Sequence, residues 1–248
     1  MTKILIVTGG GRGIGAATAR LGAAEGYSVV VNFAKRADSA EQVVADIAKA
    51  GGKAIAVKAD VSTEAGAVAL FEACDKAFGT VTHLFNNAGI AHLLTPIEKT
   101  DVEMIDWVWR TNITSQFLCA REAVKRMSTA HGGKGGVIVN MSSAAARIGG
   151  AGGSLAYAAS KGAIETFTTG LANEVGPHGI RVNAVRPGLI ETEIHADMGD
   201  AERTKRLTPI IPMRRTGTPE EVAEAVLWLL SDKSSYVTGT HVDVGGGR

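Results

Sequence analysis

Short apolar runs alternate with segments of helical length along the whole chain, and this alternation constrains the fold more than any other feature. The runs are continuously apolar, which is typical of strands that are buried on both faces of a parallel sheet. The segments between them carry apolar residues at helical spacing. Seven strands separated by helices predict a doubly wound α/β fold. The predicted strands are Ile4–Val7, Val29–Val31, Ala54–Val57, His83–Phe85, Val137–Val139, Ile180–Val185 and His241–Val244.

Composition excludes several classes of protein. Over 248 residues, 26 Lys and Arg balance 25 Asp and Glu to give a formal net charge of +1, so the chain lacks the basic surface of a nucleic-acid-binding protein. No uninterrupted run of about 18 apolar residues and no signal-peptide pattern occurs, so we expect no membrane span. Cys74 and Cys119 are the only cysteines, which is too few for a disulfide framework and indicates a cytoplasmic protein.

No linker divides the chain. Prolines number only six, and no Ser/Pro-rich or charge-run segment separates two halves, so we predict one domain over residues 1–248. The segment from Leu189 to about Thr218 is long for a connection inside a compact domain. Such insertions often cover a ligand, and this one is predicted to be a substrate lid.

The first predicted strand runs directly into a glycine-rich turn. It reads Thr8-Gly9-Gly10-Gly11-Arg12-Gly13-Ile14-Gly15 and leads into the helical segment Ala16–Ala24. Glycine lets the backbone turn tightly and approach a ligand, and the free N–H groups at a helix start bind phosphate. A glycine turn between a strand and a helix therefore predicts a dinucleotide-binding site.

This turn resembles that of the short-chain dehydrogenase/reductase family, which reads Thr-Gly-x-x-x-Gly-x-Gly, and the resemblance covers essentially the whole chain. Asn86-Asn87-Ala88-Gly89 and Pro187-Gly188 match further family motifs. The resemblance implies a single-domain Rossmann-type sheet and an NAD(P)-dependent oxidoreductase that transfers a hydride between its cofactor and a carbonyl or secondary alcohol. The family's cofactor contacts fall on Gly9, Gly13, Ile14, Gly15, Asp60, Val61, Asn87, Ala88, Gly89, Tyr157, Lys161, Pro187, Gly188, Ile190 and Thr192.

Tyr157 and Lys161 lie four residues apart on one face of a predicted helix. A nearby ammonium favours a phenolate, so Lys161 is expected to lower the pKa of Tyr157 and make it a usable general acid/base. The resemblance assigns proton transfer to Tyr157, the nicotinamide ribose to Lys161 and a water in the proton path to Asn112. A serine at the end of the fifth strand would donate to the carbonyl oxygen. We favour Ser143, with Ser142 as the alternative.

The end of the second predicted strand bears on the choice between NAD and NADP. An acidic residue there would bind the 2′-hydroxyl of the ribose and repel a 2′-phosphate. The chain instead reads Asn32-Phe33-Ala34-Lys35-Arg36, and Arg12 lies in the glycine turn. Charge-assisted bonds from Arg12, Lys35 and Arg36 to a 2′-phosphate predict NADP(H), with dual use of NAD and solvated loop charges as alternatives.

Other chemistries find little support. The six histidines show no metal-ligand spacing, so no metal is expected, and no Gly-x-Ser-x-Gly turn follows a strand. One alternative function is a cofactor-binding scaffold or sensor without turnover. The joint presence of Asn112, Ser143, Tyr157 and Lys161 favours the enzyme, because a binding module needs only the glycine turn and its helix.

The substrate is expected to be a small molecule that contacts Ala144–Leu155, the segment Ile90–Thr95 and the lid. The stretch from Ile211 to Glu221 resembles that of 3-oxoacyl-carrier-protein reductases and bacterial glucose dehydrogenases. Arg214 or Arg215 could grip an acidic substrate or carrier, or be surface charges. The family resemblance implies a homotetramer, although the chain ends Gly245-Gly246-Gly247-Arg248 where many relatives have Asp-Gly-Gly.

Overall fold

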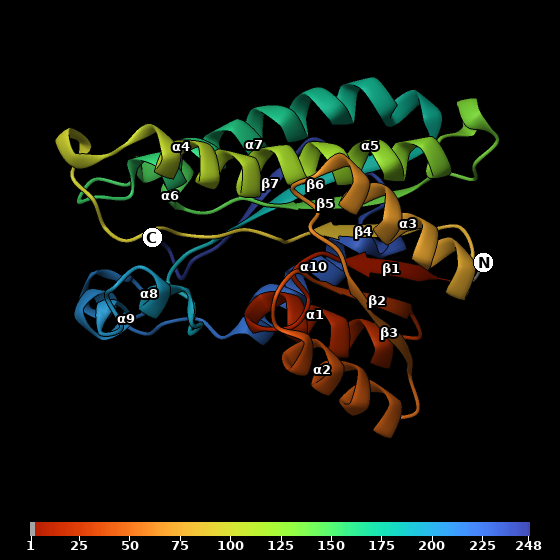
Figure 1. Cartoon of the computed structure of the whole chain (residues 1–248), viewed down its shortest axis with the longest axis horizontal. Helices are drawn as coiled ribbons and strands as arrows, with labels where there is room; N and C mark the ends of the chain where they lie inside the picture. Colours follow the sequence, from red (N-terminus) through yellow and green to blue (C-terminus); the bar gives the residue numbers. More distant parts are fainter. Residues whose placement is uncertain (1–2) are drawn as a thin grey trace.

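A seven-stranded parallel sheet in the order β3-β2-β1-β4-β5-β6-β7 forms the centre of the protein (Figure 1). The computed structural model describes residues 3–248. The predicted doubly wound Rossmann-type fold is confirmed, and five of the strands extend slightly beyond their predicted ends. The strands are β1 Ile4–Val7, β2 Ser28–Phe33, β3 Lys53–Lys58, β4 His83–Asn86, β5 Gly136–Met141, β6 Ile180–Pro187 and β7 His241–Val244.

Helices cover both faces of the sheet (Figure 1). One face is covered by α1 (Gly13–Ala24), α2 (Ala37–Lys49) and α10 (Pro219–Leu230). The opposite face is covered by the longer helices α3, α5 and α7, with α4 continuing into α5 through a π-helical turn. These elements are α3 Glu64–Phe78, α4 Val102–Trp109, the π turn Arg110–Thr114, α5 Ser115–Met127 and α7 Leu155–Val175, and the short helices are α6 Ala145–Ile148, α8 Ile194–Asp197 and α9 Arg203–Leu207.

The apolar runs are explained by burial on both sides. In β1, Leu5 and Val7 belong to the core under α1, α2 and α10. Ile6 points the other way, into the core under α3, α5 and α7. Successive strand residues face opposite sides of a sheet, so a strand with helices on both faces has no polar face.

The strand order reverses beside β1, which pairs with β2 on one side and β4 on the other. In such sheets the crossover connections diverge at this point and leave a crevice at the carboxyl ends of the strands, where ligands bind. The segment with α8 and α9, at the left of Figure 1, lies beyond that edge. Among the helices of residues 3–248, none is long and apolar enough to cross a membrane.

Candidate active site

A cleft of about 250 Å³ opens at the carboxyl ends of β1, β4, β5 and β6. It brings together most of the residues predicted from the family motifs with part of the segment after β6. The predicted residues that line it are Gly9, Arg12, Gly13, Ile14, Asn87, Ala88, Gly89, Ser143, Tyr157, Lys161, Pro187, Gly188, Ile190 and Thr192. The predicted residues outside its lining are Gly15, Asn32, Lys35, Arg36, Asp60, Val61 and Asn112.

The glycine turn is held in place by the end of β4. Gly9 and Gly13 have φ angles of +61° and +50°, which L side chains rarely adopt. A Cβ on Gly15 would lie 2.6 Å from both Asn87 Nδ2 and the Gly9 carbonyl oxygen. Asn87 Nδ2 itself donates to the carbonyls of Thr8 at 2.9 Å and Gly9 at 3.1 Å. Close backbone approach therefore explains why glycine occupies these positions.

The start of α1 fits a phosphate group. Arg12 is the N-cap residue, its side chain makes no capping hydrogen bond, and the first turn contains no acidic residue. The first amides of the helix thus meet no side-chain acceptor within residues 3–248, and the positive end of the helix dipole points into the cleft edge. Together with the close glycine backbone, this arrangement fits the diphosphate of a dinucleotide.

Asn32 connects three strand ends instead of lining the cleft. Its side chain is 2% exposed, accepts from the Gly9 amide at 3.2 Å and donates to the Ala59 carbonyl at 3.0 Å. Asp60 is exposed at the end of β3, where its Oδ1 accepts from the Ser62 hydroxyl at 2.7 Å, and Val61 is buried. The amide of Asn32 therefore has a structural use that the sequence did not indicate.

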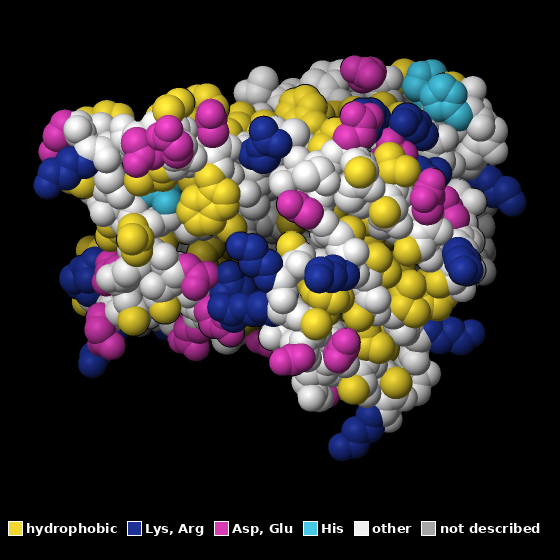
Figure 2. Space-filling model, viewed as in Figure 1, with side chains coloured by type: hydrophobic (Ala, Val, Ile, Leu, Met, Phe, Trp, Pro, Cys, Tyr) yellow, Lys and Arg dark blue, Asp and Glu magenta, His cyan; other side chains and the backbone are white. Residues whose placement is uncertain are grey.

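Two of the predicted phosphate-binding arginines contact acidic residues that follow β6. Glu193 Oε2 lies 2.9 Å from Arg12 Nη1 and 2.7 Å from Arg36 Nη1. Asp197 in α8 pairs with Arg12 at 2.7 Å, while Lys35 is exposed. Figure 2 shows basic and acidic side chains meeting where the α8–α9 segment faces α1 and α2. These ion pairs fasten the segment after β6 to the glycine turn.

Tyr157 and Lys161 share one side of α7. Lys161 is 2% exposed, its Nζ donates to the Met141 carbonyl at 2.9 Å, and it lies 5.6 Å from the centre of the Tyr157 ring. Burial lowers the pKa of Lys161 to about 8. Burial raises the pKa of Tyr157, although a hydrogen bond with Ser143 and the charge of Arg203 act in the opposite direction. The prediction that Lys161 lowers the pKa of Tyr157 is therefore wrong: burial raises this pKa, and the groups that lower it are Ser143 and Arg203.

The two adjacent serines face different partners. Ser142 is 1% exposed, and its hydroxyl donates to Glu165 Oε1 at 2.9 Å. Ser143 lines the cleft, as Ser142 does, and its hydroxyl accepts from the Ala145 amide at 3.1 Å. Of the two, Ser143 is the hydroxyl that lowers the pKa of Tyr157.

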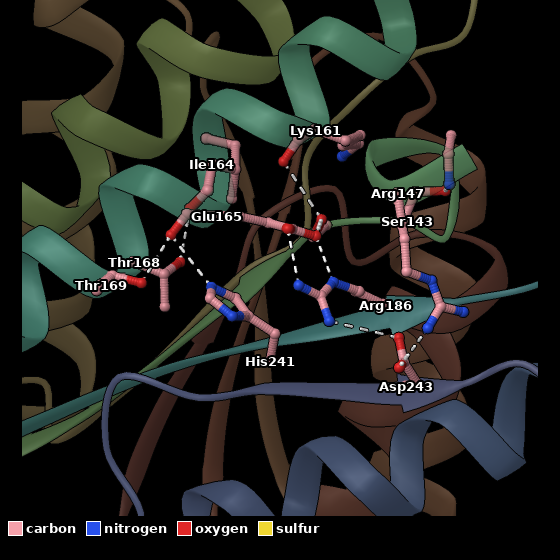
Figure 3. Close-up of polar contacts among 12 residues, drawn as sticks. Ser143, Arg147, Lys161, Ile164, Glu165, Thr168, Thr169, Arg186, His241 and Asp243 are labelled. Carbon is pink, nitrogen blue, oxygen red and sulfur yellow. Dashed lines mark hydrogen bonds and ion pairs between the residues drawn. The ribbon is translucent and has the colours of Figure 1, made fainter. Parts of the chain in front are cut away.

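Behind these serines, a chain of charged side chains joins α7, β6, β7 and α6 (Figure 3). Arg186 Nη2 bonds Glu165 Oε2 at 2.8 Å, and its Nη1 lies 3.6 Å from Asp243 Oδ1. Asp243 in turn pairs with Arg147 at 3.2 Å. Sequence analysis missed this network because its members are far apart in the chain and belong to no recognised motif.

Asn112 lies in the π turn between α4 and α5 and is fully buried. Its Oδ1 accepts from the Ile90 amide at 2.8 Å, and its Nδ2 donates to the Ile90 carbonyl at 2.9 Å and to Ser160 Oγ at 3.0 Å. A Cβ on Gly89 would lie 3.2 Å from Asn112 Oδ1 and 3.5 Å from Lys161 Nζ. Asn112 is thus next to Lys161, behind Gly89, and the irregular turn sets its position.

The substrate side of the cleft includes apolar and basic residues from α6 and from the segments that follow β6. Arg203 in α9 and Arg248 at the end of the sequence both line it, together with Ile148, Leu189 and Met198. Arg214 instead donates to the Pro209 carbonyl and Arg215 pairs with Glu221. Neither Arg214 nor Arg215 lines the cleft. Sequence analysis missed Arg248 because the tail was assigned only to subunit contact.

Within residues 3–248, no group of three His, Cys, Asp or Glu side chains is arranged to hold a metal ion. Proton donors, a buried lysine and a phosphate cradle instead meet at one edge of a parallel sheet. This fold and this cleft place the chain among the dinucleotide-dependent α/β oxidoreductases.

Comparison with known proteins identifies the family. A family model described as Enoyl-(Acyl carrier protein) reductase matches residues 9–248. An Escherichia coli protein named Uncharacterized oxidoreductase YgfF is 53% identical over 99% of each chain, and 3beta-hydroxysteroid dehydrogenase 1 of Eggerthella lenta is 41% identical over 99% of this chain and 93% of its own. A short-chain type dehydrogenase/reductase structure from Mycobacterium marinum superposes with a TM-score of 0.93 at 32% identity, over 99% of this chain and 94% of the other. The chain belongs to the short-chain dehydrogenase/reductase family of oxidoreductases.

Proposed function

We propose that the protein is an NADP(H)-preferring oxidoreductase that interconverts a carbonyl compound and a secondary alcohol, with Tyr157 as the general acid/base. The placement of Ser143 and Tyr157 in one cleft with the glycine turn, beside a buried Lys161, is the observation that carries this proposal. A scaffold without turnover would need the glycine turn but not this arrangement of proton donors.

When bound, the nicotinamide cofactor supplies or accepts the hydride. The Ser143 hydroxyl donates a hydrogen bond to the substrate oxygen as negative charge develops there. Tyr157 gives its phenolic proton to that oxygen in reduction and takes it back in oxidation. Its raised pKa keeps the phenol protonated at neutral pH, which is the state that reduction requires.

Lys161 and Asn112 are assigned supporting roles. The Lys161 ammonium is close to the Tyr157 ring and stabilises negative charge on the phenolic oxygen after proton transfer, and it would also hold the nicotinamide ribose. Asn112 is assigned the water that returns the proton, next to Lys161 and Gly89. The family contacts at Gly9, Ile14, Ala88, Gly188, Ile190 and Thr192 would hold the cofactor along the cleft.

The preference for NADP(H) rests on charge. No acidic residue lies at the end of β2, where Lys35 and Arg36 follow instead, and Arg12 lies close to Arg36 because both bond Glu193. Because Glu193 bonds both Arg12 and Arg36, a 2′-phosphate would compete with the Glu193 carboxylate for these arginines. Dual use of NAD is the second candidate.

The proposed lid covers residues 189–218 of a single domain. It is tied back by the parallel bridge between Ile190 and Gly217 and by the Glu193 ion pairs. Ile148, Leu189 and Met198 give the substrate side an apolar wall, which suits a cyclic or long-chain alcohol. The 3beta-hydroxysteroid activity in the name of one relative supports a secondary alcohol.

A homotetramer in the cytoplasm is the proposed state of the protein. Trp107 in α4 and Phe117 in α5 are exposed over one face of the sheet. Trp228 in α10 and Tyr236, shortly before β7, are also exposed. Apolar side chains of this size favour contact with further subunits. Cys74 and Cys119 are buried free thiols, which suits a reducing compartment.

A spectrophotometric screen tests the function. Purified protein is assayed with NADPH and NADH against aldehydes, ketones and 3-oxoacyl thioesters, and with NADP against polyols and sterols. We expect turnover on one substrate class. A Tyr157→Phe variant should bind NADPH as the wild type does, measured by cofactor fluorescence, and lose at least about 10²-fold in kcat. Undiminished turnover in that variant would disprove the assignment.

A further inference from the structure

Two arginines stand on the substrate side of the cleft, opposite the glycine turn. Arg203 comes from α9 and Arg248 from the last residue of the sequence, and both line the same cleft as Ser143 and Tyr157. The charge of Arg203 lowers the pKa of the Tyr157 phenol, against the larger effect of burial. Arg203 is therefore within electrostatic reach of the group that transfers the proton.

The two guanidinium groups also influence each other. The pKa of Arg248 is lowered, first by burial and then by the charge of Arg203. Two cations that line the same partly buried cleft repel each other, and an anion bound between them would relieve that repulsion. Such a pair is the arrangement that binds carboxylate and phosphate groups.

Neither arginine is fully neutralised by the chain itself. Arg203 has only a long contact of 3.8 Å with Asp200. That carboxylate is already bound by Arg206 through two hydrogen bonds, one of them 2.8 Å long. Within residues 3–248, the Arg248 guanidinium makes no ion pair, and the one bond of this residue to another side chain is through its carbonyl, which accepts from Arg147 at 2.8 Å.

The glycines before Arg248 bring it to the cleft. A Cβ on Gly188 would lie 2.7 Å from Gly245 Cα, so the tail crosses directly over the turn after β6. Gly246 and Gly247 have φ angles of +62° and +91°, and side chains there would collide with Ile211 and Pro212 at 2.9 Å. The tail therefore passes through a space that only glycine fits.

Charged groups behind the tail hold it in this path. Asp243, at the end of β7, is bonded by Arg147 and contacted by Arg186. Figure 3 shows Arg147 and Arg186 on either side of Asp243. Arg147 also donates to the main-chain oxygen of Arg248. The charged network behind Ser142 and Ser143 therefore also positions Arg248.

We propose that Arg203 and Arg248 form a subsite for an anionic group of the substrate. The substrates would then be oxo or hydroxy compounds that carry an oxyanion, either a carboxylate or a phosphate. This inference rests on the proposed function for the reacting end of the substrate. The carbonyl lies at Ser143 and Tyr157, and the anionic end lies at the two arginines.

Binding of matched ligands tests the subsite without turnover. Calorimetric titration compares 4-oxocyclohexanecarboxylate with its uncharged amide, and dihydroxyacetone phosphate with dihydroxyacetone. We expect one of the anionic ligands to bind about 10–100-fold more tightly than its neutral partner, the range expected for charge-assisted hydrogen bonds. The pair with the larger ratio identifies carboxylate or phosphate as the natural group.

Three variants of the two arginines and one control variant locate the effect. Arg203→Gln and Arg248→Gln should each lower the anion-to-neutral ratio about 10-fold or more, and Arg203→Lys should retain part of it. Lys205→Gln removes the same charge from the same helix, but Lys205 is 87% exposed and should leave the ratio unchanged. Equal affinity for both members of each pair, or a ratio that survives both Gln variants, would overturn the subsite.

The same ligands separate this inference from the proposed function. Ketone turnover with no anion preference in binding would contradict the subsite alone. An anion preference lost in Arg203→Gln and Arg248→Gln, in a protein that reduces none of the ketones, would contradict the proposed chemistry alone.

Discussion

Glu193 Oε2 lies 2.7 Å from Arg36 Nη1, so a carboxylate of the proposed lid is bonded to a cation proposed for the 2′-phosphate of NADP(H). The same oxygen contacts Arg12 at 2.9 Å. Any ligand phosphate that reaches these arginines must share them with Glu193. The carboxylate thus sets how strongly the site can favour the phosphorylated cofactor.

Glu193→Gln is expected to raise the ratio of kcat/KM for NADPH over NADH about 3–10-fold, because it removes a negative charge next to the 2′-phosphate. Glu202→Gln is the matched control, since Glu202 is 77% exposed and its carboxylate pairs with Lys205 at 3.7 Å. Initial rates with both cofactors measure the ratio. A ratio that falls in Glu193→Gln would mean that Glu193 orders the arginines for the phosphate instead of competing with it.

Lys161→Met is expected to change how stability depends on pH. Burial lowers the pKa of Lys161 from 10.5 to about 8 in the folded protein. Between pH 8 and 10.5 the unfolded chain therefore holds a proton that the folded chain has lost, and the stability of the wild type rises with pH over this window. The rise relative to Lys161→Met should reach up to about 3 kcal/mol.

Urea denaturation of the wild type and Lys161→Met at pH 7 and pH 10 measures this difference. Other ionisable groups are common to both proteins and cancel. Parallel stability curves would show that Lys161 keeps its ordinary pKa in the folded state. We also expect Lys161→Met to lose activity at every pH in the series, because no charge then faces Tyr157.

Gly15→Ala is expected to destabilise the fold by about 1–3 kcal/mol and to weaken cofactor binding. The added Cβ would meet Asn87 Nδ2 and the Gly9 carbonyl oxygen at 2.6 Å, so the glycine turn must move away from the end of β4. Gly170→Ala in α7 is the control, because nothing lies within 4 Å of its Cβ. It should stabilise the protein by up to about 1 kcal/mol. Urea denaturation and NADPH fluorescence titration read out both effects.

A double-mutant cycle with Glu165→Gln and Arg186→Met is expected to give a coupling energy of about 1–3 kcal/mol. The two side chains are each 18% exposed and bond through two pairs of atoms. Each single variant leaves one charge without this partner and should lower the free energy of unfolding. The double variant should therefore be destabilised by less than the sum of the two single variants. Additive effects in thermal or urea unfolding would mean that the pair contributes little.

The sheet could be predicted well because its pattern is local. Ile4–Val7 and His241–Val244 have the predicted bounds. Ile4–Val7 is apolar throughout because both of its faces are covered. The glycine turn was predictable for a similar reason, because the succession of strand, glycines and helix is local in the sequence.

The remaining features depend on contacts between distant segments. The sequence left Ser142 and Ser143 open, and the difference between them comes from Glu165, which is 23 residues from Ser142 along the chain and takes its hydroxyl. Burial of Tyr157, which outweighs the charge argument for its pKa, requires the assembled cleft. The position of Arg248 depends on the path of three glycines against the turn after β6.

The ion pair between Arg12 and Glu193 joins residues 181 positions apart, and both residues line the cleft. Parallel strands pair only after long crossover segments have formed, so chains of this topology fold slowly. A ribosome-bound chain that has released its glycine turn still lacks the opposite wall of its own cleft. The cleft therefore gains its second wall only after β6 and the segment that carries Glu193 have been synthesised.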